Sequence, residues 1–159
     1  MGIEIERKFL VRDVTVLLGA AGTTMRQGYL STDPDRTVRV RLAGTRGFIT
    51  IKGAASADGK SRAEYEFEIP AADAGELLDR LALRPLIEKT RYRISHDGAT
   101  WEVDVFSGAN EGLVVAEIEV PSAATPVALP PWVGGEVTGD ARYYNASLVG
   151  RPYSEWPEH

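Results

Sequence analysis

Hydrophobic and polar residues alternate along much of the chain, which is typical of β-strands whose two faces meet different surroundings. Turn signals such as Asp58-Gly59 and Asp97-Gly98 separate the alternating runs, and the second is a common hairpin turn. The pattern predicts strands at residues 3–11, 25–31, 37–42, 48–52, 62–69, 86–95, 100–106 and 113–120. So many short strands joined by short loops predict a mainly β, α+β fold with an antiparallel meander or barrel.

Two segments show the longer period of a helix. Residues 74–83 place three leucines on one face, which predicts an amphipathic helix. A weaker helical pattern covers residues 141–149, where Asp140 is placed to cap the first turn. Residues 121–131 are rich in proline and alanine and are expected to form a connector.

Long charged side chains occupy one face of almost every predicted strand. Residues i and i+2 of a strand point to the same side, so Arg39 and Arg41 share a face, as do Glu117 and Glu119. The full set on these faces is Glu4, Glu6, Lys8, Arg39, Arg41, Lys52, Arg62, Glu64, Glu66, Glu68, Lys89, Arg91, Arg93, Glu102, Asp104, Glu117 and Glu119.

Two structures fit this alternation. The commoner one is a sheet whose polar face is in contact with water. Here, however, the polar faces are almost purely charged and are segregated by sign, and neighbouring like charges repel each other. A barrel of about eight strands can hold one small ligand in its interior. We therefore expect a closed eight-stranded antiparallel tunnel lined by charges, with the helices at 74–83 and 141–149 covering its apolar outer face.

The two charge signs point to different ligands. A guanidinium group can donate two parallel hydrogen bonds to phosphate oxygens, and a lysine ammonium acts as a compact point charge. The basic set is therefore typical of a site that binds a polyphosphate. That set is Arg39, Arg41, Lys52, Lys89 and Arg91, with Lys8 within reach. Carboxylates are ligands for Mg²⁺ or Mn²⁺. The acidic set is Glu4, Glu6, Asp104, Glu117 and Glu119. Direct ion pairing of the two sets without a metal is the alternative, although converging like charges are costly to desolvate.

Composition excludes other classes of protein. The chain has no cysteine, so disulfides and thiolate chemistry are excluded, and its net charge of −5 argues against a nucleic-acid binder. No apolar run approaches the roughly 20 residues of a membrane span, and the charged first residues argue against a secretory signal. We expect a cytoplasmic protein, with residues 1–159 forming one domain.

Several motifs together resemble the CYTH superfamily, also called triphosphate tunnel metalloenzymes. Glu4-Ile5-Glu6-Arg7-Lys8 is similar to the Glu-x-Glu-x-Lys signature of that family. The resemblance continues in order over nearly the whole chain, in Arg26-Gln27-Gly28-Tyr29-Leu30, Val38-Arg39-Val40-Arg41, Thr50-Ile51-Lys52-Gly53, Glu64-Tyr65-Glu66, Ile87-Glu88-Lys89-Thr90-Arg91-Tyr92, Trp101-Glu102-Val103-Asp104, Ala116-Glu117-Ile118-Glu119 and the segment 136–143.

The resemblance implies a tunnel that binds a triphosphate, with metal held mainly by carboxylates. The implied metal ligands are Glu4, Glu6, Asp104, Glu117 and Glu119. The implied phosphate ligands are Lys8, Arg39, Arg41, Lys52, Lys89 and Arg91. Catalytic roles are expected for Glu4, Glu6, Lys8, Lys52 and Lys89. Tyr29 is a candidate contact for the substrate terminus, and packing is an equal alternative. Glu64 and Glu66 are expected to balance Lys89 and Arg91, and positioning of a water molecule is the alternative.

The expected activity is metal-dependent hydrolysis of inorganic triphosphate to pyrophosphate and phosphate, by a monomer or a homodimer. Hydrolysis of nucleoside or thiamine triphosphate, or class IV-type adenylyl cyclisation, would use the same site but would need a surface that reads a base or a ring. The sequence does not identify such a surface. A non-catalytic polyphosphate sensor would keep the cations and dispense with the carboxylates, and all five carboxylates are present.

Overall fold

A computed structural model describes residues 2–157. The strands are β1 (Gly2–Val11), β2 (Gly22–Ser31), β3 (Arg36–Ala43), β4 (Arg46–Gly53), β5 (Ser61–Ile69), β6 (Ile87–His96), β7 (Ala99–Ser107), β8 (Val114–Glu119) and β9 (Val133–Glu136). The α-helices are α1 (Ala71–Arg80) and α2 (Asn145–Gly150). Short 3₁₀ helices are η1 (Val14–Leu17), η2 (Gly108–Asn110), η3 (Ala141–Tyr143) and η4 (Tyr153–Glu155). All eight predicted strands form, with ends shifted by up to three residues, and β9 is additional.

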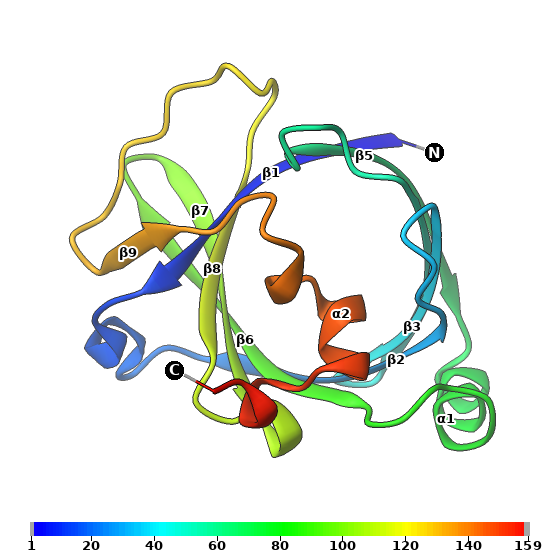
Figure 1. Ribbon diagram of the computed structural model, residues 1–159. Coiled ribbons are helices and arrows are strands. Elements are labelled where there is room, and N and C mark those ends of the chain that lie inside the picture. Colours follow the sequence, from blue (N-terminus) through cyan, green and yellow to red (C-terminus); the bar gives the residue numbers. More distant parts are fainter. Residues whose placement is uncertain (1, 158–159) are drawn as a thin grey trace.

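The strands form one antiparallel sheet that closes on itself. Its order is β5-β4-β3-β2-β6-β7-β8-β1-β9, and β1 pairs with β5 as well. The first part of β1, Gly2–Ile5, pairs with β5, and the next part, Glu6–Leu10, pairs with β8. β9 is added to the end of β1 at Phe9 and Val11. Figure 1 shows the resulting ring of strands, which confirms the predicted eight-stranded barrel.

Helix α1 lies on the outside of the ring (Figure 1). Its Ala74 and Leu78 are completely buried against Val40 of β3, as expected for a helix that covers the outer face. The predicted bounds 74–83 are wrong at both ends. The helix begins at Ala71 because the Pro70 carbonyl accepts a hydrogen bond from the Ala74 amide, which closes the first turn before the apolar face starts.

A second group of apolar residues covers another part of the outer face. Phe9, Trp101 and Ile118 of the barrel pack there against Trp132 and Val133, which follow the connector. The ring of Trp101 makes edge contacts with both Phe9 and Trp132, at centroid distances of 5.5 and 5.7 Å. The connector and β9 therefore perform the covering function that the sequence pattern assigned to residues 141–149.

The C-terminal segment is seen within the ring of strands in Figure 1, and its Tyr143 and Leu148 pack with Ile87 of β6, Phe106 of β7 and Val115 of β8. Ile87, Phe106 and Val115 lie an even number of residues from the inward charged residues of their own strands, so their side chains also point inward. The prediction that this segment covers the outer face is therefore wrong. The barrel interior is therefore apolar at one end, where the C-terminal segment packs, and charged beyond it.

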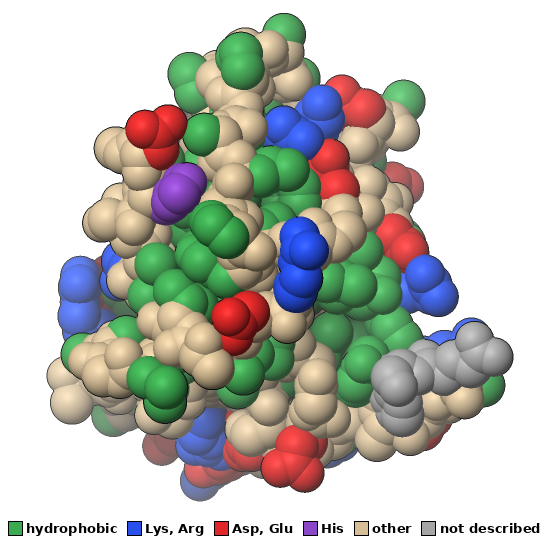
Figure 2. Space-filling view, turned by 90° about the vertical axis from the view of Figure 1, so that its left-hand side faces the viewer, with side chains coloured by type: hydrophobic (Ala, Val, Ile, Leu, Met, Phe, Trp, Pro, Cys, Tyr) green, Lys and Arg blue, Asp and Glu red, His purple; other side chains and the backbone are tan. Residues whose placement is uncertain are grey.

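The molecular surface agrees with an interior that holds the charges. The face that carries β9 and the connector shows hydrophobic patches between separate charged side chains (Figure 2). On β4 and β5, Ile51, Tyr65 and Phe67 remain 37%, 38% and 57% exposed. Within residues 2–157, no helix has the length and apolar character needed to cross a membrane.

Candidate active site

The interior of the barrel contains a cavity of about 570 Å³. Strands β1 to β8 and the C-terminal segment supply its walls, because alternate residues of each strand point inward. The structure brings nearly all predicted site residues to this cavity. Its lining includes Glu4, Glu6, Lys8, Tyr29, Arg39, Arg41, Lys52, Lys89, Arg91, Glu117 and Glu119. Asp104 lies just behind the lining, 1% exposed, against Lys89 and Arg91.

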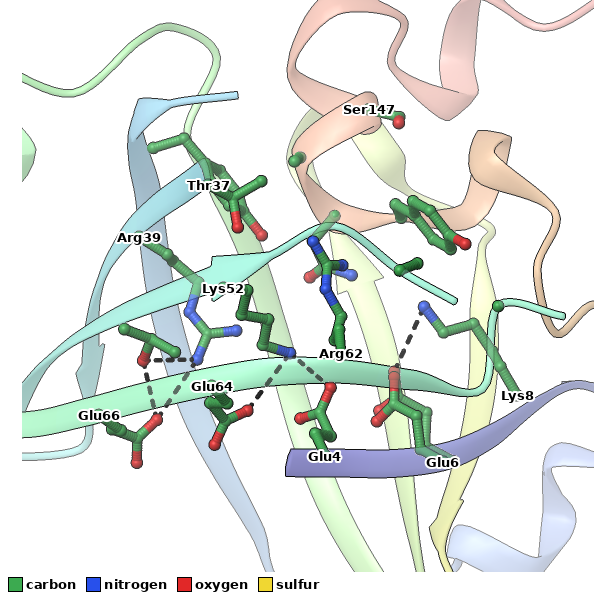
Figure 3. A pocket seen from close by; sticks show the side chains of 18 of the residues that line it. Glu4, Glu6, Lys8, Thr37, Arg39, Lys52, Arg62, Glu64, Glu66 and Ser147 are labelled. Atoms are coloured by element: carbon green, nitrogen blue, oxygen red, sulfur yellow. Dashed lines mark hydrogen bonds and ion pairs between the residues drawn. The ribbon is translucent and has the colours of Figure 1, made fainter. Parts of the chain in front are cut away.

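Lys52 of β4 lies between two carboxylates near the point where β1 meets β5. Its Nζ donates to Glu4 Oε1 at 2.8 Å and lies 3.6 Å from Glu64 Oε2 (Figure 3). Burial by itself would raise the pKa of Glu4, but Lys52 and a hydrogen bond with Glu64 lower it. Burial and Glu4 raise the pKa of Glu64 to about 7. One ammonium group therefore does not neutralise this carboxylate pair.

Glu6 of β1 and Glu117 of β8 form a second carboxylate pair, with Lys8 beside it. Lys8 Nζ lies 3.5 Å from Glu117 Oε1. Burial raises the pKa of Glu6 well above its usual range, and Glu117 and Glu4 raise it further. Although burial opposes it, the charge of Lys8 lowers the pKa of Glu117 to about 2. Two of the acidic ligands expected for a metal are thus adjacent, and one of them resists ionisation.

Asp104 of β7 holds two of the predicted phosphate ligands. Its Oδ2 accepts from Lys89 Nζ at 2.7 Å, and its two oxygens accept from Arg91 Nε and Nη2 at 2.8 and 2.9 Å. These contacts follow from the register, which places Asp104 opposite Arg91 on the same inward face. Burial lowers the pKa of Lys89, and Arg91 adds to this effect. A metal-binding role for Asp104 stays a prediction, since both of its oxygens face cations here.

Arg39 and Arg41 of β3 have few anionic partners. Arg39 Nη2 donates to Thr50 Oγ1 at 3.1 Å and lies 3.7 Å from Glu66 Oε2 (Figure 3). Its Nε is buried without a hydrogen-bond partner. Arg41 makes no ion pair with any described residue, and its Nε donates to the neutral amide of Gln27 at 2.9 Å. Burial and the neighbouring Arg39 lower the pKa of Arg41 to about 9.

The structure corrects the expected partners of Glu64 and Glu66. Both residues do balance cations, as predicted, but not Lys89 and Arg91. β5 lies beside β4, and the register places Glu64 opposite Lys52 and Glu66 opposite Thr50. Glu64 therefore meets Lys52, and Glu66 meets Thr50 and the more distant Arg39.

Several residues at the site were absent from the predicted set. Gln27 is completely buried behind the cavity lining, where it contacts Arg41. It lies on the same inward face of β2 as Tyr29, so strand parity alone could have identified it. Arg62 shares the charged face of β5 with Glu64 and Glu66, and it lines the cavity although the sequence did not predict a role for it in the site. Tyr144 and Asn145 line it too, and their place depends on where the C-terminal segment packs. Tyr29 both lines the cavity and packs in the apolar end, so its two expected roles remain compatible.

The acidic side of the cavity suits a divalent cation. Among residues 2–157, no three acidic or histidine side chains already have the arrangement of a metal site. The donor set is nevertheless appropriate, because carboxylate oxygens from β1 and β8 lie side by side. The pKa values of Glu6 and Glu119 are raised by burial and by repulsion from Glu4 and Glu117, and a bound cation would relieve that repulsion.

Arginine and lysine on one side of the cavity and carboxylates on the other can together bind a multiply charged anion and its counter-cation. Comparisons with known proteins agree with this arrangement. An inorganic triphosphatase of Acetivibrio thermocellus is 49% identical over 158 residues, which cover 99% of this chain and 100% of the relative. An inorganic triphosphatase of Nitrosomonas europaea is 43% identical over 151 residues, covering 92% of this chain and 96% of the relative.

A crystal structure of an inorganic triphosphatase superposes with a TM-score of 0.64 at 38% identity, covering 92% of this chain and 97% of the other. The family model described as the CYTH domain matches residues 2–153. By its sequence, its closed barrel and the charged interior of that barrel, this chain belongs to the CYTH domain family.

Proposed function

We propose that this protein hydrolyses inorganic triphosphate to pyrophosphate and phosphate within the barrel. The observation that carries the proposal is the pair of arginines on β3. Arg39 has a buried Nε without an acceptor, and Arg41 has no ion-pair partner among residues 2–157. Buried guanidinium groups are stable when they bind anions, and phosphate oxygens fit their paired donors. The names of the two curated relatives supply the substrate class.

The cations of the cavity would bind the phosphate groups. They are Lys8, Arg39, Arg41, Lys52, Lys89 and Arg91. A free inorganic polyphosphate, rather than a nucleotide, suits a cavity of about 570 Å³ that is lined by charged side chains from every strand of the ring except β2. Since the lining contains both signs of charge, the anion would enter together with a counter-cation that satisfies the carboxylates.

Glu4, Glu6, Glu117 and Glu119 would hold that cation, and Mg²⁺ or Mn²⁺ are the expected ions because both prefer carboxylate oxygens. A divalent cation supplies charge neutralisation and activation of a water molecule at such a site. In the reaction, water attacks the terminal phosphorus, the bond from that phosphorus to its bridging oxygen breaks, and pyrophosphate leaves. Arg39, Arg41 and the lysines stabilise the charge that develops on the oxygens in the transition state.

Phosphate release from a panel of substrates tests the proposal. Triphosphate, ATP, thiamine triphosphate and pyrophosphate are each supplied with Mg²⁺ and with Mn²⁺, and EDTA-treated protein serves as the control. We expect the highest kcat/KM for inorganic triphosphate and no release without a divalent cation. An equal or higher kcat/KM with ATP, the formation of cyclic AMP, or tight binding without any turnover would each contradict the assignment.

A further inference from the structure

The C-terminal segment places a neutral amide among the cations of the cavity. Asn145, the first residue of α2, accepts two hydrogen bonds at its Oδ1. Lys89 Nζ donates one at 3.0 Å and Gln27 Nε2 donates the other at 2.7 Å. The side chain of Gln27 is completely buried, and its Oε1 accepts from Arg41 Nε at 2.9 Å. Two amides thus connect Lys89 to Arg41 across the interior.

These amides orient the cations without neutralising them. A carboxylate in either place would accept the same hydrogen bonds, although one at position 27 could not donate to Asn145, and it would also cancel the positive charge of the cation that donates to it. Asp104 provides that contrast on the other side of Lys89, where it forms an ion pair at 2.7 Å. The neutral amide of Gln27 therefore leaves the charge of Arg41 available to an anionic ligand, and Asn145 adds no second negative charge beside Lys89, while both amides fix where the two cations lie.

Asn145 also has hydrogen-bonding capacity left for a ligand. Both of its bonds to the protein use Oδ1, and its Nδ2 has no partner among residues 2–157. An amide nitrogen carries two donor hydrogens, which phosphate oxygens can accept. Because Asn145 lines the cavity, this group is available at the place where the cations converge.

The two residues before Asn145 contact the site as well. Lys8 Nζ donates to the Tyr143 carbonyl at 3.3 Å. The ring of Tyr144 lies beneath two cations, 5.6 Å from Lys8 Nζ and 5.9 Å from Arg62 Cζ. Three consecutive residues of the C-terminal segment therefore contact cations that come from different strands.

We propose that Asn145 and Gln27 are positioning residues for the triphosphate, and that α2 is part of the binding site in addition to filling one end of the barrel. The inference rests on the proposed function. Asn145 holds Lys89 directly and Arg41 through Gln27, so that both cations are fixed in place without an added negative charge beside them. Neither amide reacts: Gln27 acts through Arg41, and Asn145 acts through Lys89 and through its free Nδ2, which can donate to a phosphate oxygen.

Isosteric charge substitution separates this role from simple packing. Asn145→Asp keeps the size and both acceptor contacts but adds a negative charge beside Lys89, whereas Asn145→Ala removes the contacts without adding charge. We expect Asn145→Asp to raise the KM for Mg²⁺-triphosphate by about tenfold or more, and by more than Asn145→Ala does. The melting temperature of the ligand-free Asn145→Asp protein should equal or exceed that of Asn145→Ala, because Asp can pair with Lys89.

A second variant and a matched control complete the test. Gln27→Glu adds the same charge on the barrel wall beside Arg41, and it should raise the KM in the same direction even if an α2 variant folds poorly. Asn110 is a completely buried amide that accepts a hydrogen bond from the Tyr153 backbone amide at 2.8 Å, outside the cavity lining. Asn110→Asp should therefore leave the KM unchanged, whatever its effect on stability.

The order of the KM values decides the outcome. A KM that is affected more by Asn145→Ala than by Asn145→Asp, or wild-type KM values in both Asn145→Asp and Gln27→Glu, would overturn the positioning role while leaving the triphosphatase function intact. A wild-type protein that releases no phosphate from triphosphate would instead overturn the proposed function, and the inference with it.

Discussion

Replacing Arg41 by Gln tests whether the charged interior is adapted to a ligand rather than to its own stability. Burial and Arg39 lower the pKa of Arg41 from 12.5 to about 9 in the folded protein. At pH 7 the group is protonated in both the folded and the unfolded chain. The folded state therefore carries a charge that it disfavours, and this cost is fully present below pH 9 and disappears above pH 12.5. It corresponds to on the order of 5 kcal/mol as an upper limit.

Arg41→Gln removes this cost and retains a polar side chain beside Gln27. We expect the ligand-free variant to melt at the same temperature as the wild type or higher, since the relief of repulsion offsets the lost packing. The same substitution should weaken triphosphate binding and so reduce the rise in Tm that triphosphate causes. For the wild type at a triphosphate concentration of about 100 Kd, linkage predicts a gain of about 2.7 kcal/mol. For a chain of this size that gain raises Tm by about 5–11 °C.

Loss of a hydrogen bond to a charged group costs about 1.5–3 kcal/mol, which raises Kd roughly 10- to 100-fold. At the same triphosphate concentration, half or less of the wild-type Tm shift should remain in Arg41→Gln. Thermal melts with and without triphosphate, with Ca²⁺ as a non-productive cation, measure both quantities. The control is Arg36→Gln on the same strand, because the Arg36 side chain is 70% exposed and pairs with Asp33. A destabilised Arg41→Gln protein with an unchanged triphosphate shift would refute the reasoning.

Two further predictions concern the carboxylates. Glu6→Gln should stabilise the metal-free protein, because burial, Glu117 and Glu4 all disfavour the charged form of Glu6, and it should raise the Mg²⁺ concentration needed for half-maximal phosphate release. An unchanged Mg²⁺ titration would remove Glu6 from the proposed ligands. The pKa of Glu117, lowered to about 2, means that its carboxylate adds stability above about pH 4.5 that is lost as the pH falls towards 2. Unfolding of Glu117→Gln followed by circular dichroism should show a shallower loss of stability over this pH range than unfolding of the wild type. An equally steep loss in both proteins would show that the Glu117 carboxylate does not contribute this stability.

The strands were predictable from local pattern because almost every one of them has one apolar and one charged face, and barrel closure follows once both faces must be satisfied. β9 was not predictable in this way. Its sequence Val133–Glu136 includes two adjacent glycines, which have low β-propensity, and it forms because the end of β1 offers it a partner. The start of α1 was not predicted correctly because its first turn is closed by a backbone hydrogen bond from Ala74 to Pro70, and the spacing of the apolar residues does not reveal that bond.

For the site, strand parity identified the charged residues, since every inward position of a barrel strand reaches the same interior. The predicted partners of Glu64 and Glu66 were wrong because the alternation along a strand shows which face a residue is on but not which strands are neighbours. Asn145 was beyond local inference for a related reason. An apolar helix face indicates that the helix packs, but the surface that it packs against is decided by residues distant in sequence, such as Ile87 and Phe106.

The three pairings of β1 have a consequence for how the protein matures during synthesis. β1 is the first strand of the chain, yet its partners are residues 61–64, 115–119 and 133–136. It also carries Glu4, Glu6 and Lys8. While the chain grows from its N-terminus, the partner of Glu4 on β5 appears early, but Glu6 and Lys8 have no partner on β8 until about three quarters of the polypeptide exists. Contacts so distant in sequence make folding slow. The last step that closes the barrel is then also the step that assembles the site, so a nascent or truncated chain should be unable to bind polyphosphate prematurely.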